Sequence, residues 1–259
     1  MPATRDTSQR RLQISELVRQ QGSVQVVSLA RRFGVSQQTV RKDLRYLAER
    51  GVMARAYGGA IDSSAVGAPP PEPAYEAKRT VHQEEKRRIG RRAAALVRPG
   101  DTIAIDSGTT AIQLAEALPD IEIAVVTNDF GVLSALTAKR HIRIVMLGGE
   151  LRRKNMAFYG GLTVEALDAL HVDKLFLGVD GFDLERGITT HYEPEAMLNR
   201  KMVEAARAVI AITDSSKFGK VCLHRIIAVS ELDTLITDTA APEEIRQASG
   251  QLGFELLLA

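Results

Sequence analysis

The sequence predicts an α/β protein in which a small helical module at the N-terminus precedes a larger domain built on a mostly parallel sheet. Through residue 60, apolar residues recur mainly at helical spacing. Residues 63–73 then contain four prolines, which oppose a helix and favour an extended linker. Beyond this stretch, short apolar runs alternate with helical patterns, which is typical of a sheet covered on both faces by helices. We therefore expect one domain over residues 1–62, a linker over 63–80 and a second domain over 81–259.

The N-terminal module is expected to contain two helices followed by a tight turn and a third helix. In the first helix, over about 8–20, the inward residues are Ile14, Leu17 and Val18. The short second helix ends at Gly34, which can adopt a left-handed conformation. Ser36 can then cap the third helix, because its hydroxyl oxygen can accept hydrogen bonds from backbone N–H groups.

The third helix combines an apolar inner face with a basic outer face. Val40, Leu44 and Leu47 recur at i, i+4 and i+7, so they are expected to face the core. Arg can bond guanine through two hydrogen bonds, Gln can pair with adenine, and Lys can neutralise phosphates, so the outer face suits the major groove of DNA. A solvated face of a small helical bundle is the alternative. The candidate DNA-contacting residues are Ser36, Gln37, Gln38, Thr39, Arg41, Lys42, Arg45 and Arg55.

Two further features favour nucleic acid over a solvated face. Residues 52–57 alternate roughly and turn at Gly58 and Gly59, as in the hairpin wing of a winged helix, where Arg55 could reach a phosphate or the minor groove. Residues 1–60 hold 11 Lys and Arg against 4 Asp and Glu, a net charge of +7, whereas the whole chain carries only +2. The remaining residues therefore sum to −5. A basic module on an acidic body predicts that double-stranded DNA is the partner of the first domain alone.

Composition excludes several other classes of protein. Cys222 is the single cysteine, so neither an internal disulfide nor a cysteine-cluster zinc site can form, and a buried apolar role is expected for it. The five histidines show no metal-ligand spacing. No run of 18 apolar residues and no apolar signal region occur. We expect a cytoplasmic protein with no membrane segment, no metal and no cofactor.

The second domain begins with a basic helix over about 82–97. Its charges are expected to form a solvated face, with DNA contact as the alternative; they are Lys86, Arg87, Arg88, Arg91 and Arg92. Strands are then expected over 102–105, 123–127, 142–147, 174–179, 209–213, 234–237 and 254–258. Helices are expected over 109–117, 130–139, 164–170, 193–207 and 242–250.

Polar residues collect where these strands end, which is the edge at which ligands bind in such sheets. The turn from Asp106 to Thr110 opens a helix, and its N–H groups and hydroxyls can hold a phosphate. Similar polar or glycine-containing ends follow at 127–128, 148–149, 178–181 and 214–217. Each of these five sets alone could be a helix cap or a strand-ending turn, but together at one edge they favour a pocket for a phosphorylated polyol. No P-loop and no dinucleotide-binding motif occurs. The candidate effector-binding residues are Asp106, Ser107, Gly108, Thr109, Thr110, Thr127, Asn128, Gly148, Gly149, Asp180, Glu193, Glu195, Arg200 and Lys217.

These motifs resemble the DeoR family of bacterial regulators of sugar metabolism over nearly the whole chain. The matching stretches are 29–30, 33–36, 39–41, 43–44, 47, 51, 55, 57–60, 106–110, 127–128, 148–149, 187–190 and 214–219. The resemblance implies a winged helix-turn-helix that binds operator DNA and a sensor domain similar in fold to ribose-5-phosphate isomerase. It also implies that the isomerase phosphate loop falls on 107–110. The isomerase's catalytic Asp and Lys fall near Asp180 and Lys217, which are expected to bind ligand.

Residues 175–200 are similar to one branch of that family, the repressors of N-acetylgalactosamine use, which implies an amino-sugar phosphate as effector. We expect a homo-oligomeric repressor, a dimer or tetramer, that a phosphorylated sugar releases from operator DNA. Activation of transcription is one alternative. The other is a sugar-phosphate isomerase or amino-sugar phosphate deaminase, in which Asp180, Glu193 or Glu195 would be the base and Lys217 would stabilise an enediolate.

Overall fold

The computed structural model describes residues 7–21, 23–50, 52, 54–56, 59–61, 72 and 75–259. The chain divides into two compact units, Met1–Lys78 and Arg79–Ala259. The prolines of the expected linker and the wing residues Tyr57 and Gly58 lie outside the described residues. A helix at 75–80 falls inside the expected linker. The division at 62/63 and 80/81 stays a prediction.

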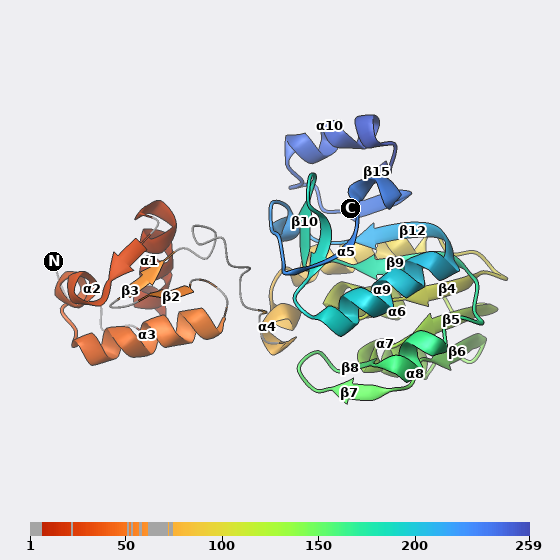
Figure 1. The fold of residues 1–259 in the computed structure, drawn as a ribbon, viewed down its shortest axis with the longest axis horizontal. Helices are drawn as coiled ribbons and strands as arrows, with labels where there is room; N and C mark the ends of the chain where they lie inside the picture. The colour runs from red at the N-terminus through yellow and green to blue at the C-terminus, as the bar shows by residue number, and fades with distance from the viewer. Residues whose placement is uncertain are drawn as a thin grey trace. The chain divides into compact units, whose positions relative to one another are not determined.

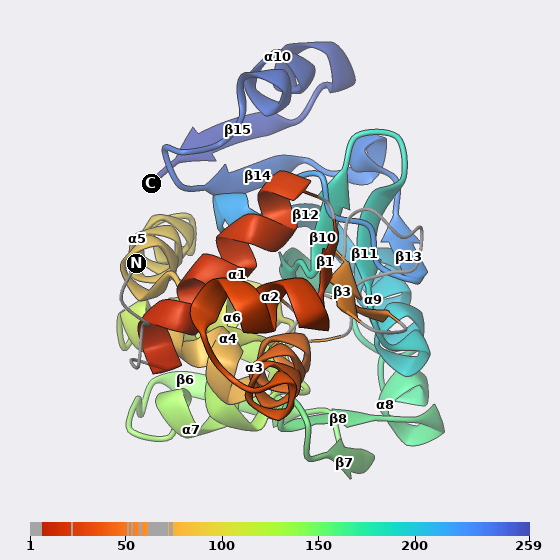
Figure 2. The ribbon, with the colours of Figure 1, turned by 90° about the vertical axis from the view of Figure 1, so that its left-hand side faces the viewer.

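The N-terminal unit is a bundle of helices beside a small antiparallel sheet (Figures 1 and 2). Its described elements are α1 (Thr7–Gln21), β1 (Ser23–Gln25), α2 (Val26–Phe33), α3 (Gln37–Glu49), β2 (Ala54–Ala56) and β3 (Gly59–Ile61). Ile14, Leu29, Val40 and Leu44 meet in its core and are nearly inaccessible to solvent. The helices and the hairpin of β2 and β3 match the expected winged helix-turn-helix.

One strand of this unit was not expected from the sequence. The strand β1 pairs antiparallel with β3, so β3 lies in the middle of the small sheet with β2 on its other side. Three residues between two helices are too short for an alternating pattern to stand out. The consequence is that the hairpin is joined by backbone hydrogen bonds to the segment between α1 and α2.

The C-terminal unit is built on a parallel sheet. Residues 75–259 form the helices α4 (Tyr75–Thr80), α5 (Gln83–Ala94), α6 (Thr109–Ala117), α7 (Phe130–Leu136), α8 (Gly161–Glu165), α9 (Glu193–Ala205) and α10 (Glu243–Leu252), with 3₁₀ turns η2 (Ser215–Lys217) and η3 (Val229–Glu231). The strands are β4 (Thr102–Ile105), β5 (Ile123–Thr127), β6 (Ile142–Met146), β7 (Glu150–Arg152), β8 (Ala157–Tyr159), β9 (Val172–Gly178), β10 (Gly181–Asp183), β11 (Gly187–Thr190), β12 (Ala206–Ile212), β13 (His224–Ile227), β14 (Thr234–Thr237) and β15 (Glu255–Leu258).

Within residues 75–259, seven strands form the main sheet in the order β15-β14-β12-β9-β4-β5-β6, and every neighbouring pair is parallel. Two apolar clusters lie on its two faces. Ile89 of α5 and Leu114 of α6 pack on one face, whereas Met202 of α9 and Ile245 of α10 pack on the other. All main strands therefore end at one edge, as the predicted ligand site requires.

The sequence placed most elements of this unit correctly. The strands expected over 102–105, 123–127 and 234–237 have those bounds. The helix expected over 164–170 was wrong: α8 begins at Gly161, after Gly160 in a positive-φ conformation, and the chain then continues in short turns. The helix expected over 193–207 ends at Ala205, because Ala206 already has an extended backbone and begins β12.

Candidate functional site

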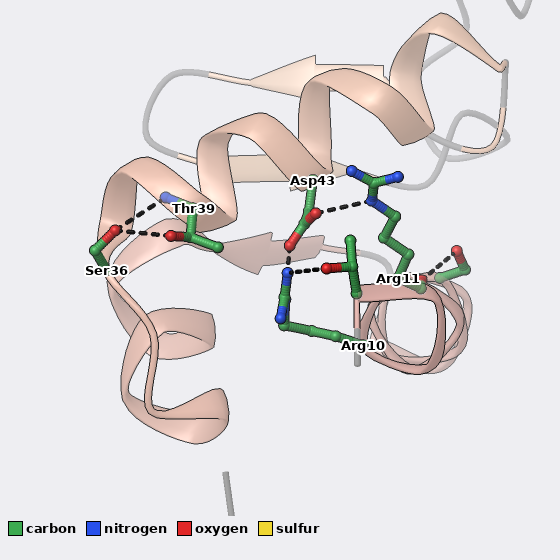
Figure 3. A network of polar contacts seen from close by, with 7 residues as sticks. Arg10, Arg11, Ser36, Thr39 and Asp43 are labelled. Carbon is green, nitrogen blue, oxygen red and sulfur yellow. Dashed lines mark hydrogen bonds and ion pairs between the residues drawn. The ribbon is translucent and has the colours of Figure 1, made fainter. Parts of the chain in front are cut away.

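The helix α3 begins at a serine cap and presents polar side chains to solvent. The backbone N–H of Thr39 donates to Ser36 Oγ at 3.1 Å, as expected for a capped helix (Figure 3). Val40, Leu44 and Leu47 are buried on the inner side. The exposed residues on the other side are Gln37, Gln38, Arg41, Lys42 and Arg45. The arrangement that suits DNA is therefore present, and the contacts of individual residues remain proposals.

A buried carboxylate bonds α3 to α1. Asp43 accepts a hydrogen bond from Arg10 Nε at 2.7 Å and another from Arg11 Nε at 2.8 Å, and its side chain lies between the two arginines (Figure 3). Asp43 is 1% exposed and Arg10 is 4% exposed. The guanidinium of Arg11 also lies over the ring of Tyr46, 3.6 Å from its centroid, and Arg50 lies at 3.7 Å. These contacts fix the orientation of α3 relative to α1.

The role of Asp43 was missed in the sequence, although a signal was present. Asp43 follows Val40 by three residues and precedes Leu47 by four, so helical spacing puts a charge on the apolar face. A charge at such a position requires a buried partner.

Arg55, expected in the wing, lies in β2 with Ala60 opposite it in β3.

In the C-terminal unit, Asp106 joins the tip of β4 to two other elements. Its Oδ2 accepts hydrogen bonds from the N–H of Gly178, where β9 ends, at 3.1 Å and from Asn199 Nδ2 of α9 at 3.2 Å. Asp106 and Asn199 are almost completely buried, and Asp106 Oδ1 and Asn199 Oδ1 have no hydrogen-bond partner within the described structure. A buried acceptor without a partner favours a hydrogen-bond donor next to it.

Tyr159 of β8 connects further predicted residues. Its hydroxyl lies 3.1 Å from Ser107 Oγ, accepts from Asn155 Nδ2 at 2.6 Å and donates to Glu195 Oε2 at 3.4 Å. Burial raises the pKa of Tyr159 well above its ordinary value, so the hydroxyl keeps its proton. The turn after β4, the β7–β8 hairpin and α9 therefore meet at one buried hydroxyl. Tyr159 and Asn155 were missed in the sequence because that hairpin was not expected.

Tyr192 extends this arrangement outward. Its ring meets the ring of Tyr159 edge to face, with centroids 5.5 Å apart. The guanidinium of Arg152, from β7, lies 4.2 Å from the centroid of Tyr192. An arginine and an aromatic ring therefore lie next to the buried polar groups. Arginine is a residue type that binds anions, and aromatic rings stack on sugar rings.

Several predicted effector residues act instead on the local backbone. Thr127 Oγ1 accepts from the N–H of Asp129, and Asn128 Nδ2 donates to the carbonyl of Phe158. Gly149 has φ +123°, and a Cβ there would meet Thr163 and would lie 2.6 Å from the carbonyl oxygen of Tyr159. Asn128 and Gly149 contact the strand β8, so they position the β7–β8 hairpin, and their effect on a ligand would be indirect.

Four other predicted residues lie in three different settings. Asp180 accepts a hydrogen bond from Thr190 Oγ1 at 3.3 Å, and its charge acts on Asp106. Lys217 lies in η2, and its charge acts on Asp214. Burial works to raise the pKa of Asp214, but a hydrogen bond with Ser216 and the charge of Lys217 lower it. Glu193 and Arg200 are exposed, and Arg200 Nη1 donates to the carbonyl of Arg225 in β13. The structure thus does not bring Glu193 and Arg200 to Asp106.

Two carboxyl groups at the strand tips titrate near neutral pH. Burial raises the pKa of Asp106 from 3.8 to about 7, and the carboxylates of Asp129 and Asp180 act in the same direction. Burial likewise raises the pKa of Asp129 to about 6. The unfolded chain releases these protons at lower pH than the folded chain does. Protonation of the two carboxyl groups therefore contributes fully to the free energy of unfolding below about pH 4, and this contribution is lost as the pH rises through about 7.

Replacing Asp106 with Asn should therefore remove its part of this pH dependence. As the pH rises from 4.5 to 8, the wild type is expected to lose on the order of 3 kcal/mol more free energy of unfolding than Asp106→Asn. The amide keeps the shape of the side chain and removes its charge. Urea unfolding at both pH values measures this difference, and Glu185→Gln, at an exposed position, is the control. Parallel pH profiles for Asp106→Asn and the wild type would show that Asp106 is already ionised at pH 4.5.

Among the described residues, no group of three or more His, Cys, Asp or Glu could hold a metal ion. No described helix is long and apolar enough to cross a membrane. Cys222 is buried, as expected.

Taken with the parallel-sheet unit and its buried polar edge, the capped basic helix and hairpin define a DNA-binding regulator with a separate sensor domain. Two family models match the chain: the DeoR-like helix-turn-helix domain over residues 10–65 and the DeoR C terminal sensor domain over 81–239. The chain belongs to the DeoR family. It is therefore a transcription regulator, and the reading as an isomerase or deaminase was wrong.

Curated relatives match over almost their full length. The chain is 42% identical to the protein of Escherichia coli O157:H7 assigned as the aga operon transcriptional repressor, over 97% of this chain and 94% of that one. It is 34% identical to the glycerol-3-phosphate regulon repressor of Escherichia coli K12, over 93% and 94%. It is 33% identical to the HTH-type transcriptional repressor GlcR of Bacillus subtilis, over 96% and 95%. A solved ribose 5-phosphate isomerase A from Methanocaldococcus jannaschii aligns with a TM-score of 0.39 at 17% identity, over 52% and 54% of the two chains.

Proposed function

We propose that this protein represses a carbohydrate catabolic operon from the cytoplasm and that a phosphorylated sugar, of the amino-sugar class, releases it from operator DNA. The observation that supports the proposal is the combination of a capped, outwardly basic α3 with a sheet edge that gathers buried polar groups. The relative that is assigned to the aga operon supports the amino-sugar class.

The proposed DNA contacts are made by the exposed residues of α3 and by the wing. A single helix-turn-helix unit makes few phosphate contacts, so a homo-oligomer that binds two half-sites would supply the affinity for operator DNA. The effector would bind at the strand tips, where Ser107, Thr109 and Lys217 offer hydroxyls and a cation to a phosphate. Glu195 and Asp106 offer acceptors to hydroxyl or ammonium groups. Release requires only that the effector bind the DNA-free state more tightly than the DNA-bound state.

The charge of Lys217 provides a test of the effector site. Lys217→Ala is expected to bind operator DNA as tightly as the wild type and to need at least about tenfold more sugar phosphate for release, because a charge-assisted contact to phosphate is lost. Fluorescence anisotropy of a labelled duplex, titrated with the sugar phosphate, measures both quantities. The matched control is Arg207→Ala, an exposed cation at the opposite end of the strand β12 that precedes η2. Release of Lys217→Ala at the wild-type concentration would remove Lys217 from the site.

A further inference from the structure

Of the large apolar side chains that the structure describes in the C-terminal unit, the three most exposed lie on neighbouring elements. Leu162 of α8 is 72% exposed, Met197 of α9 is 51% exposed, and Leu223, which directly precedes β13, is 66% exposed. The helix α9 contacts both α8 and β13, and the three elements follow one side of this unit (Figure 2). Single exposed apolar residues are ordinary, but several on adjoining elements indicate a surface that binds another protein. We call the surface around Leu162, Met197 and Leu223 the α9 face.

The outer side of α9 carries opposite charges on either side of Met197. Glu193 precedes Met197 by four residues and Arg200 follows it by three, so all three lie on one stripe of the helix, and all three are exposed. Among the described residues, Glu193 has no charged partner, and Arg200 Nη1 donates to the carbonyl of Arg225 rather than to a carboxylate. The stripe therefore presents an acid, an apolar side chain and a base in that order.

This order makes the stripe complementary to itself. If two α9 helices pack antiparallel around a twofold axis at Met197, residues before Met197 in one copy lie opposite residues after it in the other copy. Glu193 of each copy then lies opposite Arg200 of the other, and the two Met197 side chains meet at the axis. An apolar centre with a polar rim is the usual composition of a protein–protein interface. The order of charges therefore favours a second copy of this chain as the partner.

The inner side of α9 contacts the sheet edge that we propose for the effector. Asn199 Nδ2 donates to Asp106 Oδ2, and Glu195 Oε2 accepts from the hydroxyl of Tyr159. Glu195 and Asn199 are buried, whereas Met197, which lies between them in the sequence, is exposed. One helix therefore connects the sheet edge to the α9 face.

We propose that the α9 face is an interface between two copies of this chain, in which their α9 helices pack antiparallel around Met197. The role of this interface in regulation rests on the proposed function. A ligand that moves Asn199 or Glu195 also moves α9, and a shift of a helix at a subunit interface changes how the two copies pack. The spacing of two DNA-binding units must match the spacing of two half-sites, so such a change weakens operator binding.

Sedimentation velocity of the full-length protein over a range of concentrations tests the charge pairs. The wild type is expected to self-associate. Glu193→Arg and Arg200→Glu each place like charges opposite each other twice in a dimer, so each is expected to weaken self-association at least about tenfold. Glu193→Arg/Arg200→Glu restores opposite charges and is expected to recover association, which a loss of folding could not explain. Glu243→Arg, which reverses an exposed charge on α10, is the matched control and is expected to associate like the wild type.

Oxidative cross-linking of the full-length protein tests the position of the axis. Met197→Cys places a thiol at the proposed axis in both copies, and a disulfide forms only where the two Cα atoms lie within about 7 Å. Mild oxidation is expected to convert this variant to a covalent dimer on denaturing electrophoresis without reductant. Leu252→Cys, at an exposed position on α10, is the control and is expected to stay unlinked. The native Cys222 is buried, so the wild type is expected to stay unlinked as well.

Four outcomes would each overturn the interface: a monomeric wild type, full association of both single charge variants, no recovery in the double variant, or no cross-link in Met197→Cys. Release of operator DNA by phosphorylated sugars is a separate measurement. If the charge variants and the cross-link behave as expected but no such sugar releases the wild type, the proposed function fails and the interface stands. If sugars release the wild type but Met197→Cys does not cross-link, the interface fails and the proposed function stands.

Discussion

Asp43→Ala is expected to lower the free energy of unfolding of the N-terminal unit by about 3 kcal/mol, because it leaves the buried guanidinium of Arg10 without its carboxylate. Arg11 loses the same partner, but it is more exposed and still lies over Tyr46. A loss of this size is a large fraction of the stability of a small domain. The amides of α3 should therefore exchange with solvent far faster in the variant.

Hydrogen exchange measured on the full-length protein resolves this effect, because it reports α3 separately from the C-terminal unit. Glu49→Ala, which removes an exposed carboxylate from the same helix, is the control and is expected to change the stability by less than about 0.5 kcal/mol. If exchange in α3 is unchanged by Asp43→Ala, the ion pairs contribute nothing to the position of the recognition helix.

Arg41→Ala is expected to weaken operator binding by about 100-fold or more. Arg41 is exposed on α3, on the side opposite Val40 and Leu44. A bidentate contact to a base is worth about 1–3 kcal/mol, and a symmetric oligomer loses it at both half-sites. Because the side chain makes no contribution to the core, the Tm and the binding of sugar phosphate should not change.

Operator binding by Arg41→Ala can be measured by anisotropy with a duplex that the wild type selects from a random library. Arg140→Ala, which removes an exposed arginine from the C-terminal unit, is the control for net charge. An affinity equal to that of the wild type would mean that α3 does not read the operator through Arg41.

The sequence predicted elements best where one periodic pattern decided their structure. The helix over Ile14 and Val18, the capped α3 and the strands β4, β5 and β14 depend on local spacing and on apolar side chains that the fold buries. The hairpin of β7 and β8 and the added strand β1 depend on pairing between short segments, for which three residues give no pattern.

The same distinction applies to the candidate site. Ser107 and Asp106 follow a strand and could be placed at its tip from the sequence. Tyr159, Asn155 and Asn199 reach them from a hairpin and a helix far along the chain, so only the tertiary structure brings them together. The expectation that Lys86 lies on a solvated face was wrong: the residue is buried, and packing decided this, since its helix carries cations on several sides.

The central claim is that binding of operator DNA and binding of a phosphorylated sugar oppose each other in one chain. The direct measurement is the affinity of the wild-type protein for its selected duplex, titrated with a panel of phosphorylated sugars and their unphosphorylated counterparts. At least one phosphorylated sugar is predicted to raise the Kd for DNA by about tenfold or more, and by reciprocity DNA must weaken the binding of that sugar by the same factor. A Kd for DNA that stays constant with every phosphorylated sugar would contradict the account.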